Sequence, residues 1–370
     1  MTDSLPPLSL DRWLKTLEDE YLSDYIPSGG SAVKFVTGTD AVLSRVLSSL
    51  SEVAASTGCR YAPLDPGKPD AAGKRPDLHK IDKLFFKLTE NVDWEECASR
   101  QARQYLEKQG IHLIEGRALG DLEQIALDND RDPQDLLSQY QRELATPLIK
   151  DPRLSIEFRT AITSLGRSLL TPDAVTPTTK EVLLGWFAGR SQPGASTALK
   201  KVQIYERINL ANARNMLASF CRWLPQTGSS GLVATFDFRP YEFKKIAKSI
   251  RQQEQIEKVR EAVARNADNF ELSALTQDVN ASDPEVFYSD AAYMQMLTML
   301  RRFIDEIDRF DNLLLVVLTS PNFYKDKALD PAIKRCYFDY DALQTRIGQE
   351  VHDARFANPA ASLVHLEEAK

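Results

Sequence analysis

Hydrophobic positions follow two different periods in the first part of the chain. Apolar side chains recur every three or four positions from 9 to 26, which predicts an amphipathic helix. Residues 32–37 form a β-branched and aromatic run that is typical of a short buried strand. Helical spacing returns at 41–56, and 59–66 read as a second strand that its prolines end. A strand, helix and strand in this order predict a sheet that is at least partly parallel.

The pattern changes again along the rest of the chain. Residues 67–80 are polar and rich in glycine and proline, as in an exposed loop, and helical patterns dominate from there to 224. Strand character returns at 231–238 and at 312–321, with a mainly helical stretch from 240 to 310 between them. We therefore predict an α/β protein with the parallel-sheet core of a P-loop NTPase (AAA+/RecA-like) and a large helical insertion.

The length of 370 residues exceeds the size at which one hydrophobic core usually stops growing. We predict three parts. Residues 1–90 hold the N-terminal helix and the first half of the core, 91–226 are the mainly helical insertion, and 227–370 hold the second half of the core with a C-terminal helical segment.

Composition narrows the classes of function. Apolar residues make up 43% and charged residues 27%, as in an ordinary globular protein, and a net charge of -7 gives no global basic field for nucleic acid. The four cysteines form no CxxC pair and the four histidines have no metal-ligand spacing, so neither a zinc site nor a disulfide framework is indicated. No long apolar run and no leader pattern occur, so we expect a cytoplasmic protein without membrane contact.

The turn after the first strand raises a question about phosphate binding. A phosphate-binding loop needs a glycine, four spacers, and then glycine, lysine and serine or threonine. This chain begins correctly with Gly38 but continues with Leu43, Ser44 and Arg45 at the last three positions. The setting is therefore that of a phosphate loop, whereas the chemically active residues differ.

Four segments in this order resemble the ATP-binding proteins of BREX-type bacterial phage-defence systems, a P-loop family related to AAA+ ATPases. They are YIPSGGSAVKFVTG, GLVATFD, LLLVVLTSPNFY and YDALQTRI, and they span nearly the whole chain. GWFAGR at 185–190 and NARNMLASFCRWL at 212–224 also resemble segments of that family. The resemblance implies a P-loop core that is degenerate at its nucleotide site.

Compared with the family, the loop has lost most of its chemistry. Leu43 puts a branched side chain where the backbone should approach phosphate, Ser44 replaces the lysine, and Arg45 replaces the Mg²⁺-binding hydroxyl. Arg45 could instead neutralise a phosphate, and a helix N-terminus could still bind an anion weakly. If the turn after Gly38 keeps the family's backbone, Gly, Lys and Thr at 43–45 should restore nucleotide binding.

The second signature strand shows a matching loss. The family ends this strand in aspartate and glutamate, which position Mg²⁺ and the attacking water. This chain has Asp237 followed by Phe238, which cannot act as a base, and Glu242 is a doubtful substitute. Asp237 then reads as a turn or cap residue. At the third strand end, Thr319 and Ser320 match positions that would sense the terminal phosphate, although Ser320 also suits an ordinary turn.

Two further features point to partners. Arg346 matches a family arginine that could act in trans on a neighbouring subunit's nucleotide, or it could form a surface salt bridge on a helix. The segment 244–265 combines a helical apolar stripe with excess positive charge. It reads either as a solvated helix face or as a contact to the DNA backbone. The candidate phosphate contacts are Lys244, Lys245, Lys248 and Arg251.

These observations predict a non-catalytic P-loop ATPase-like subunit of a bacterial anti-phage defence complex. Its partners would be other subunits, an active ATPase among them, in a homo- or hetero-oligomer, with DNA as a further partner. We expect no cofactor, because ATP and Mg²⁺ binding is weak or lost. The alternative is an ATP-binding or ATP-hydrolysing switch or motor of the same system that uses atypical residues.

Overall fold

The fold is described from a computed structural model. The residues described are 6–69, 73–114, 116–171, 175–241, 288, 290–320, 323, 342–343, 345–347 and 357–368. The candidate DNA contacts Lys244, Lys245, Lys248 and Arg251 lie outside these residues.

A six-stranded sheet forms the centre of the fold, in the order β1-β6-β2-β5-β4-β3. Every strand pair in it is parallel. The strands are β1 (Pro7–Ser9), β2 (Ser31–Gly38), β3 (Arg60–Leu64), β4 (Leu232–Asp237), β5 (Leu313–Thr319) and β6 (Leu363–Glu367). Strands from the two ends of the chain lie side by side, because Pro7 of β1 pairs with His365 of β6.

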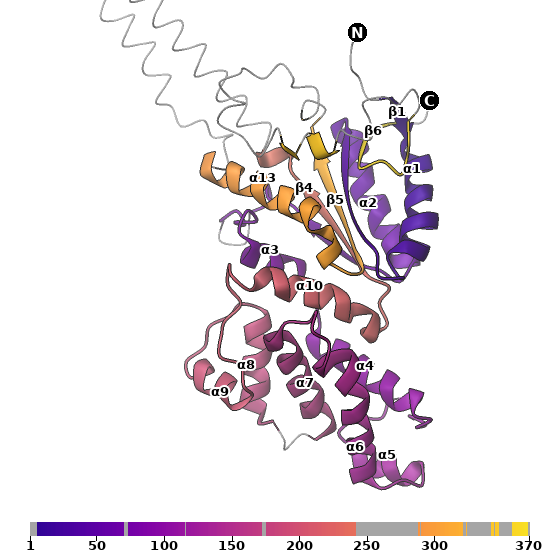
Figure 1. Cartoon of the computed structure of the whole chain (residues 1–370), viewed down its shortest axis with the longest axis vertical. Helices are drawn as coiled ribbons and strands as arrows, with labels where there is room; N and C mark the ends of the chain where they lie inside the picture. The colour runs from indigo at the N-terminus through magenta and orange to yellow at the C-terminus, as the bar shows by residue number, and fades with distance from the viewer. Residues whose placement is uncertain are drawn as a thin grey trace, which may run out of the picture.

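Helices cover both faces of the sheet (Figure 1). They are α1 (Leu10–Thr16), η1 (Leu17–Tyr25) and α2 (Asp40–Ser56) on one face, and α3 (Ile81–Leu88) and α13 (Asp290–Asp305) on the other. The side chains of β5 alternate between the two layers, because successive residues of a strand point to opposite faces. Leu313 and Leu315 pack with α3 and α13, whereas Leu314 and Val316 pack with α1 and α2. Burial on both faces explains the unbroken apolar run of this strand.

A helical lobe extends from one end of the sheet (Figure 1). It contains α4 (Trp94–Lys108), α5 (Leu122–Asp128), α6 (Pro133–Leu144), η2 (Ala145–Ile149), α7 (Ile156–Leu170), α8 (Pro177–Phe187) and α9 (Ala195–Lys201). The helix α10 (Ala213–Trp223) lies between lobe and sheet and continues into η4 (Leu224–Thr227), and η5 (Ile307–Arg309) precedes β5. One continuous hydrophobic cluster joins the lobe to the α13 face of the sheet. Its centre is Trp94, which stacks on Phe187 at 3.9 Å between ring centroids and on Trp223 at 6.1 Å.

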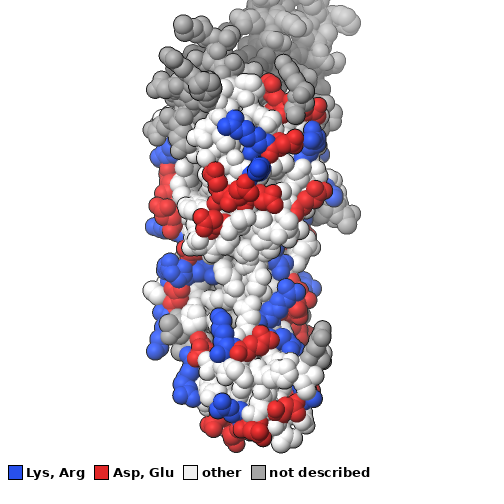
Figure 2. All heavy atoms as spheres, turned by 90° about the vertical axis from the view of Figure 1, so that its right-hand side faces the viewer, with Lys and Arg blue, Asp and Glu red and all other residues white. Residues whose placement is uncertain are grey.

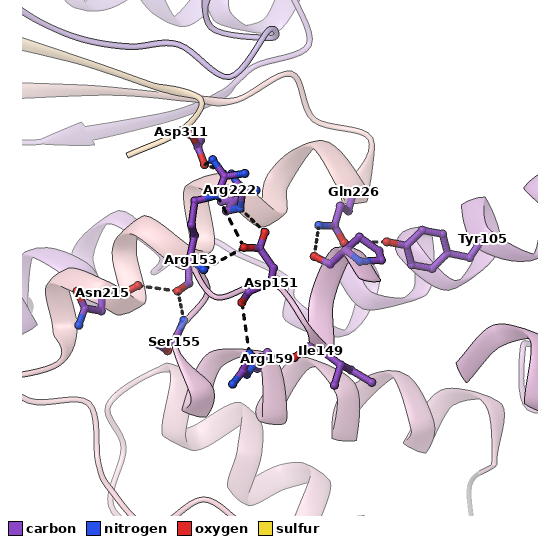
Figure 3. A network of polar contacts seen from close by, with 12 residues as sticks. Tyr105, Ile149, Asp151, Arg153, Ser155, Arg159, Asn215, Arg222, Gln226 and Asp311 are labelled. Atoms are coloured by element: carbon purple, nitrogen blue, oxygen red, sulfur yellow. Dashed lines mark hydrogen bonds and ion pairs between the residues drawn. The ribbon is translucent and has the colours of Figure 1, made fainter. Parts of the chain in front are cut away.

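An ion-pair network fastens the lobe to the sheet (Figure 3). Arg222 of α10 contacts Asp151, which lies between η2 and α7, and Asp311, which lies just before β5. Arg153 reaches the same two carboxylates at 3.7 and 3.6 Å. The side chains of Arg222, Asp151 and Asp311 are only 19%, 11% and 20% exposed, so the network is largely shielded from water.

The structure confirms the predicted α/β class and the parallel sheet. The four predicted strands begin and end within two residues of β2, β3, β4 and β5. Two short strands were missed, β1 with three residues and β6 with five. The predicted helix at 9–26 forms, but its second half, η1, is a π-helix, which spacing alone does not reveal. The proposed boundary at 90 falls between α3 and α4, and the one at 226 falls inside η4.

In the part of the chain that the structure describes, no helix combines the length and the apolar character needed to cross a membrane.

Candidate functional site

The carboxyl ends of β2, β5 and β4 meet at one edge of the sheet. Thr37 of β2 pairs with Thr319 of β5, and Asp237 of β4 pairs with Leu318. Ligands of open parallel sheets bind outside the carboxyl ends of the strands. This edge is therefore where the sequence places the nucleotide site, and the structure does bring Gly38 and Asp237 to it.

The turn after β2 is too short to surround a phosphate. The strand ends at Gly38, Thr39 is the N-cap of α2, and the helix begins at Asp40. The Thr39 hydroxyl accepts from Val42 N at 3.4 Å, and Leu43 N donates to Thr39 O at 2.9 Å. The side-chain cap satisfies one free N–H group of this helix N-terminus, and the carboxylate of Asp40 at the first helical position would repel an anion.

The three altered loop positions lie on the second turn of α2. Leu43 is fully buried between α1 and the sheet, so it serves the hydrophobic core. Ser44 is exposed, and Arg45 points to Glu368 at 3.8 Å with half of its side chain in solvent. None of these residues is part of a loop, because the backbone here is already helical.

The structure explains why position 38 is a glycine. A Cβ atom at this position would lie 3.0 Å from the backbone oxygen of Leu366 on β6. A larger residue would push the two strands apart where they pair. The glycine is therefore explained by the neighbouring strand without any phosphate.

Asp237 is held by an arginine that follows it closely. Nε of Arg239 donates to Oδ1 of Asp237 at 2.8 Å and Nη2 donates to Oδ2 at 2.7 Å, a two-pronged contact. Nη1 of the same arginine contacts the carboxylate of Asp40 at the start of α2. The hydrogen bonds that the Arg239 guanidinium donates to Asp237 raise the pKa of the guanidinium.

This arginine joins two strand ends across a third. β2 and β4 lie on either side of β5, about 10 Å apart at the usual strand spacing. Arg239 spans that distance and supplies positive charge where a P-loop enzyme holds Mg²⁺. The carboxylate of Asp237 is 13% exposed, and both of its oxygens are bound by the guanidinium.

Phe238 belongs to the core rather than to the edge. It is fully buried and lies 5.8 Å from the Tyr293 ring of α13 and 6.0 Å from the Tyr241 ring. Its backbone N–H donates to Leu318 O at 2.8 Å and so extends the sheet. Phe238 therefore stabilises the packing of α13 against the sheet.

The threonine hydroxyl groups at this edge form polar contacts with other residues of the sheet. Thr37 Oγ1 and His365 Nδ1 are 2.8 Å apart, and Thr319 Oγ1 donates to Val36 O at 3.3 Å. Ser320 O accepts from Phe323 N at 3.1 Å, which agrees with the turn interpretation of Ser320. Within the described residues, no group of three or more His, Cys, Asp or Glu side chains is placed to hold a metal ion.

Other candidate residues lie away from this edge. Arg346 forms an ion pair with Asp305, the last residue of α13, and it donates to Ala342 O at 3.2 Å. Three cysteines, Cys59, Cys97 and Cys221, are buried and free, and burial raises the pKa of each thiol. These thiols are therefore poor nucleophiles and poor metal ligands.

Sequence reasoning missed Arg239, the residue that organises this edge. Its signal was present, since an arginine two positions after a strand-end aspartate can fold back on it in a turn. The contact to Asp40 had no signal, because 199 positions separate the two residues.

Searches of protein-family models, of curated proteins and of solved structures returned no match to this chain.

Proposed function

We propose that this chain is a non-catalytic, P-loop-like subunit of a bacterial anti-phage defence complex, which acts through contacts with other proteins. The family assignment rests on the ordered segments quoted above. The structure supports the non-catalytic part of the proposal through the geometry of the sheet edge.

The strand order favours a P-loop relationship over other doubly wound folds. In dinucleotide-binding sheets the first strand lies beside the second strand of the chain. Here β2 and β3 are separated by β5 and β4. Two later strands in that position resemble the sheet of P-loop ATPases related to AAA+ proteins, and β1 is then an added edge strand.

The contact of Arg239 with Asp237 and Asp40 carries the proposal. A strand-end aspartate can position Mg²⁺ only if its oxygens are free, and here the guanidinium binds both of them. The adjoining helix starts too early to cradle phosphate and begins with an acidic residue. Leu43 and Phe238, which replace catalytic positions, both serve the core.

On the face that Figure 2 presents, the charge distribution supports protein partners more than DNA. Figure 2 shows positive and negative side chains interspersed on the face that it presents, without a continuous basic stripe. Proteins that bind DNA through its phosphates need a concentrated positive surface. Contact with DNA through 244–265 remains a secondary part of the proposal.

A thermal-shift measurement with millimolar Mg-ATP tests the proposal directly. A ligand present at 100 times its Kd stabilises the native state by about 2.7 kcal/mol, so binding would raise the melting temperature clearly. We expect no rise and no ATP hydrolysis above background. A clear rise would instead favour the alternative, a nucleotide-dependent switch with atypical residues.

A second measurement addresses the role in an assembly. Proteins encoded beside this chain should copurify with it, an active ATPase among them. If Arg346 acts on the nucleotide of that ATPase, Arg346→Ala should lower the partner's hydrolysis rate without changing this chain's melting profile. An unchanged rate with an intact complex would leave Arg346 as a surface ion pair with Asp305.

A further inference from the structure

The loop after α8 is folded tightly against α3. Arg190 N donates to Gly185 O at 2.8 Å, which turns the chain back on the end of the helix. Gly189 has a φ of +68°, and a Cβ there would lie 2.8 Å from the ring of Phe86. Only glycine fits both requirements. The backbone that carries Arg190 is therefore fixed in place.

Arg190 stands between two adjoining hollows that together form one groove. Both hollows are lined by Lys83, Phe86 and Arg190, and their volumes are about 820 Å³ and 290 Å³. The larger hollow follows α3 and the start of α4. The smaller one, called here the α8–α9 notch, is lined by apolar and polar side chains, with Val182, Trp186, Leu199, Ile204 and Ile208 among the apolar ones.

The far wall of the notch is held by a hydrogen bond. Nε1 of Trp186 donates to Glu206 O at 2.9 Å, which ties residues 204–208 to α8. Tyr205 on this wall is 73% exposed, although tyrosine usually buries much of its ring. A large exposed aromatic side chain beside a hollow is a feature of protein-binding surfaces.

Along the groove, most acidic side chains have a polar partner, whereas two arginine side chains have none among the described residues. All acidic lining residues except Glu206 have a polar partner within the described chain: Asp77 with Lys80, Asp82 with Lys83, Glu90 with Lys87, Glu95 with Lys180, and Asp93 with Glu96 N. Arg190 and Arg207 are exposed and have no polar side-chain partner among the described residues. The unused charge at the notch is therefore mainly positive.

We propose that this groove binds an acidic, extended segment of a partner protein, with one large apolar side chain seated in the α8–α9 notch. Arginine forks pair well with carboxylates, and arginine is enriched among the residues that dominate binding energy. The volume of about 290 Å³ lies just below the range of sites for whole small ligands, which suits a single anchoring side chain.

Nucleic acid fits the same groove less well. Its walls carry as many carboxylates as cations, so a phosphate backbone would face both signs of charge. The carboxylates are Asp77, Asp82, Glu90, Asp93, Glu95 and Glu206, and the cations are Lys74, Arg75, Lys83, Lys87, Arg190 and Arg207. Surfaces that bind phosphate backbones are strongly positive throughout. A short peptide can place its few acidic side chains at Arg190 and Arg207 and avoid the rest.

A peptide selection tests this inference. A random 12-residue display library is selected on the purified full chain and, in parallel, on Arg190→Glu with Arg207→Glu. We expect enrichment of peptides with at least two Asp or Glu residues near an aromatic or leucine, and no enrichment of them on the double variant. Both arginines are exposed, so the variant should keep the wild-type melting temperature, which is measured first.

Affinities then define the site. By fluorescence anisotropy, the best peptide should bind at least tenfold more weakly to the double variant and to Tyr205→Ala. The matched control is Arg12→Glu with Arg131→Glu, two exposed cations outside the groove, and it should bind like the wild type.

Three results would overturn the proposal: no enrichment, equal enrichment on the double variant, or binding of a labelled 15-nucleotide thymidine strand that the double variant loses. The inference rests on the proposed role as an assembly subunit, but its test does not depend on ATP binding. A nucleotide-binding protein could therefore still bind the peptide, and a chain that binds no nucleotide could fail to bind it.

Discussion

At each end of the sheet one arginine contacts two aspartates, but the two arginines have different roles. At the amino end, Arg222 joins Asp151 of the lobe to Asp311 before β5, and all three side chains are at most 20% exposed. At the carboxyl end, Arg239 joins Asp237 to Asp40, and the Asp40 side chain is 92% exposed. The first network fastens two parts of the molecule, whereas the second closes the place where a ligand would bind.

The difference shows that burial, rather than the number of ion pairs, decides what each arginine contributes. A carboxylate left alone in a shielded site loses its solvation as well as its partner, whereas an exposed carboxylate regains water. Removing Arg222 should therefore cost more than removing Arg239. By the same reasoning, changing a buried core residue at the carboxyl end should cost more stability than changing an exposed charged residue there.

The largest effect is expected from rebuilding a phosphate loop with Leu43→Gly, Ser44→Lys and Arg45→Thr. Leu43 is fully buried, so its loss and the new glycine should lower the free energy of unfolding by about 3–6 kcal/mol. The sequence predicted restored nucleotide binding if the family's backbone were kept, but these positions are helical. We now expect no binding, measured by urea denaturation and calorimetric titration with Mg-ATP.

A milder variant separates folding from binding in this experiment. Ser44→Lys with Arg45→Thr changes only exposed positions and should alter stability by less than about 1 kcal/mol. It should also bind no Mg-ATP. Nucleotide binding by either variant would show that α2 can unwind at its start, and the closed edge would then be a reversible state.

The second effect concerns the amino end. Arg222→Gln leaves Asp151 and Asp311 without their most buried partner, so the free energy of unfolding should fall by about 2–4 kcal/mol. Arg153→Gln is the matched control in the same network. Arg153 is 63% exposed, and its loss should cost less than about 1 kcal/mol. Equal losses in urea denaturation would contradict the role given to burial.

The third effect concerns the carboxyl end. Arg239→Gln removes the guanidinium from Asp237, whose side chain is only 13% exposed and keeps the hydrogen bond from the backbone N–H of residue 239 at 3.1 Å, so the change should cost about 1–3 kcal/mol. Adding Asp237→Asn should recover part of that loss, because an uncharged amide is less costly to bury than an unpaired carboxylate. Asp40→Asn alone should have little effect, since this residue is almost fully exposed. If the double variant is less stable than Arg239→Gln, the hydrogen bond from the backbone N–H of residue 239 stabilises the charged carboxylate without the guanidinium.

Some of this protein could be predicted from its sequence for a clear physical reason. The unbroken apolar run at 312–321 and the helical spacing at 41–56 are local consequences of which side chains must be buried, so β5 and α2 were located within two residues. The same pattern hid the role of Leu43. An apolar residue on a helix stripe and a substituted loop residue look alike until the start of the helix is known.

The sequence by itself determined the α/β class, the parallel pairing and the uncharged side chains of Ser44 and Phe238. Only the tertiary structure decided the strand order, the contact of Arg239 with Asp40 and the groove that holds Arg190. The physical reason is the separation along the chain over which each kind of interaction acts. Periodicity and propensity act over a few residues, whereas β2 and β6 or Arg222 and Asp311 meet across long stretches of chain, and those meetings depend on how all the layers pack together.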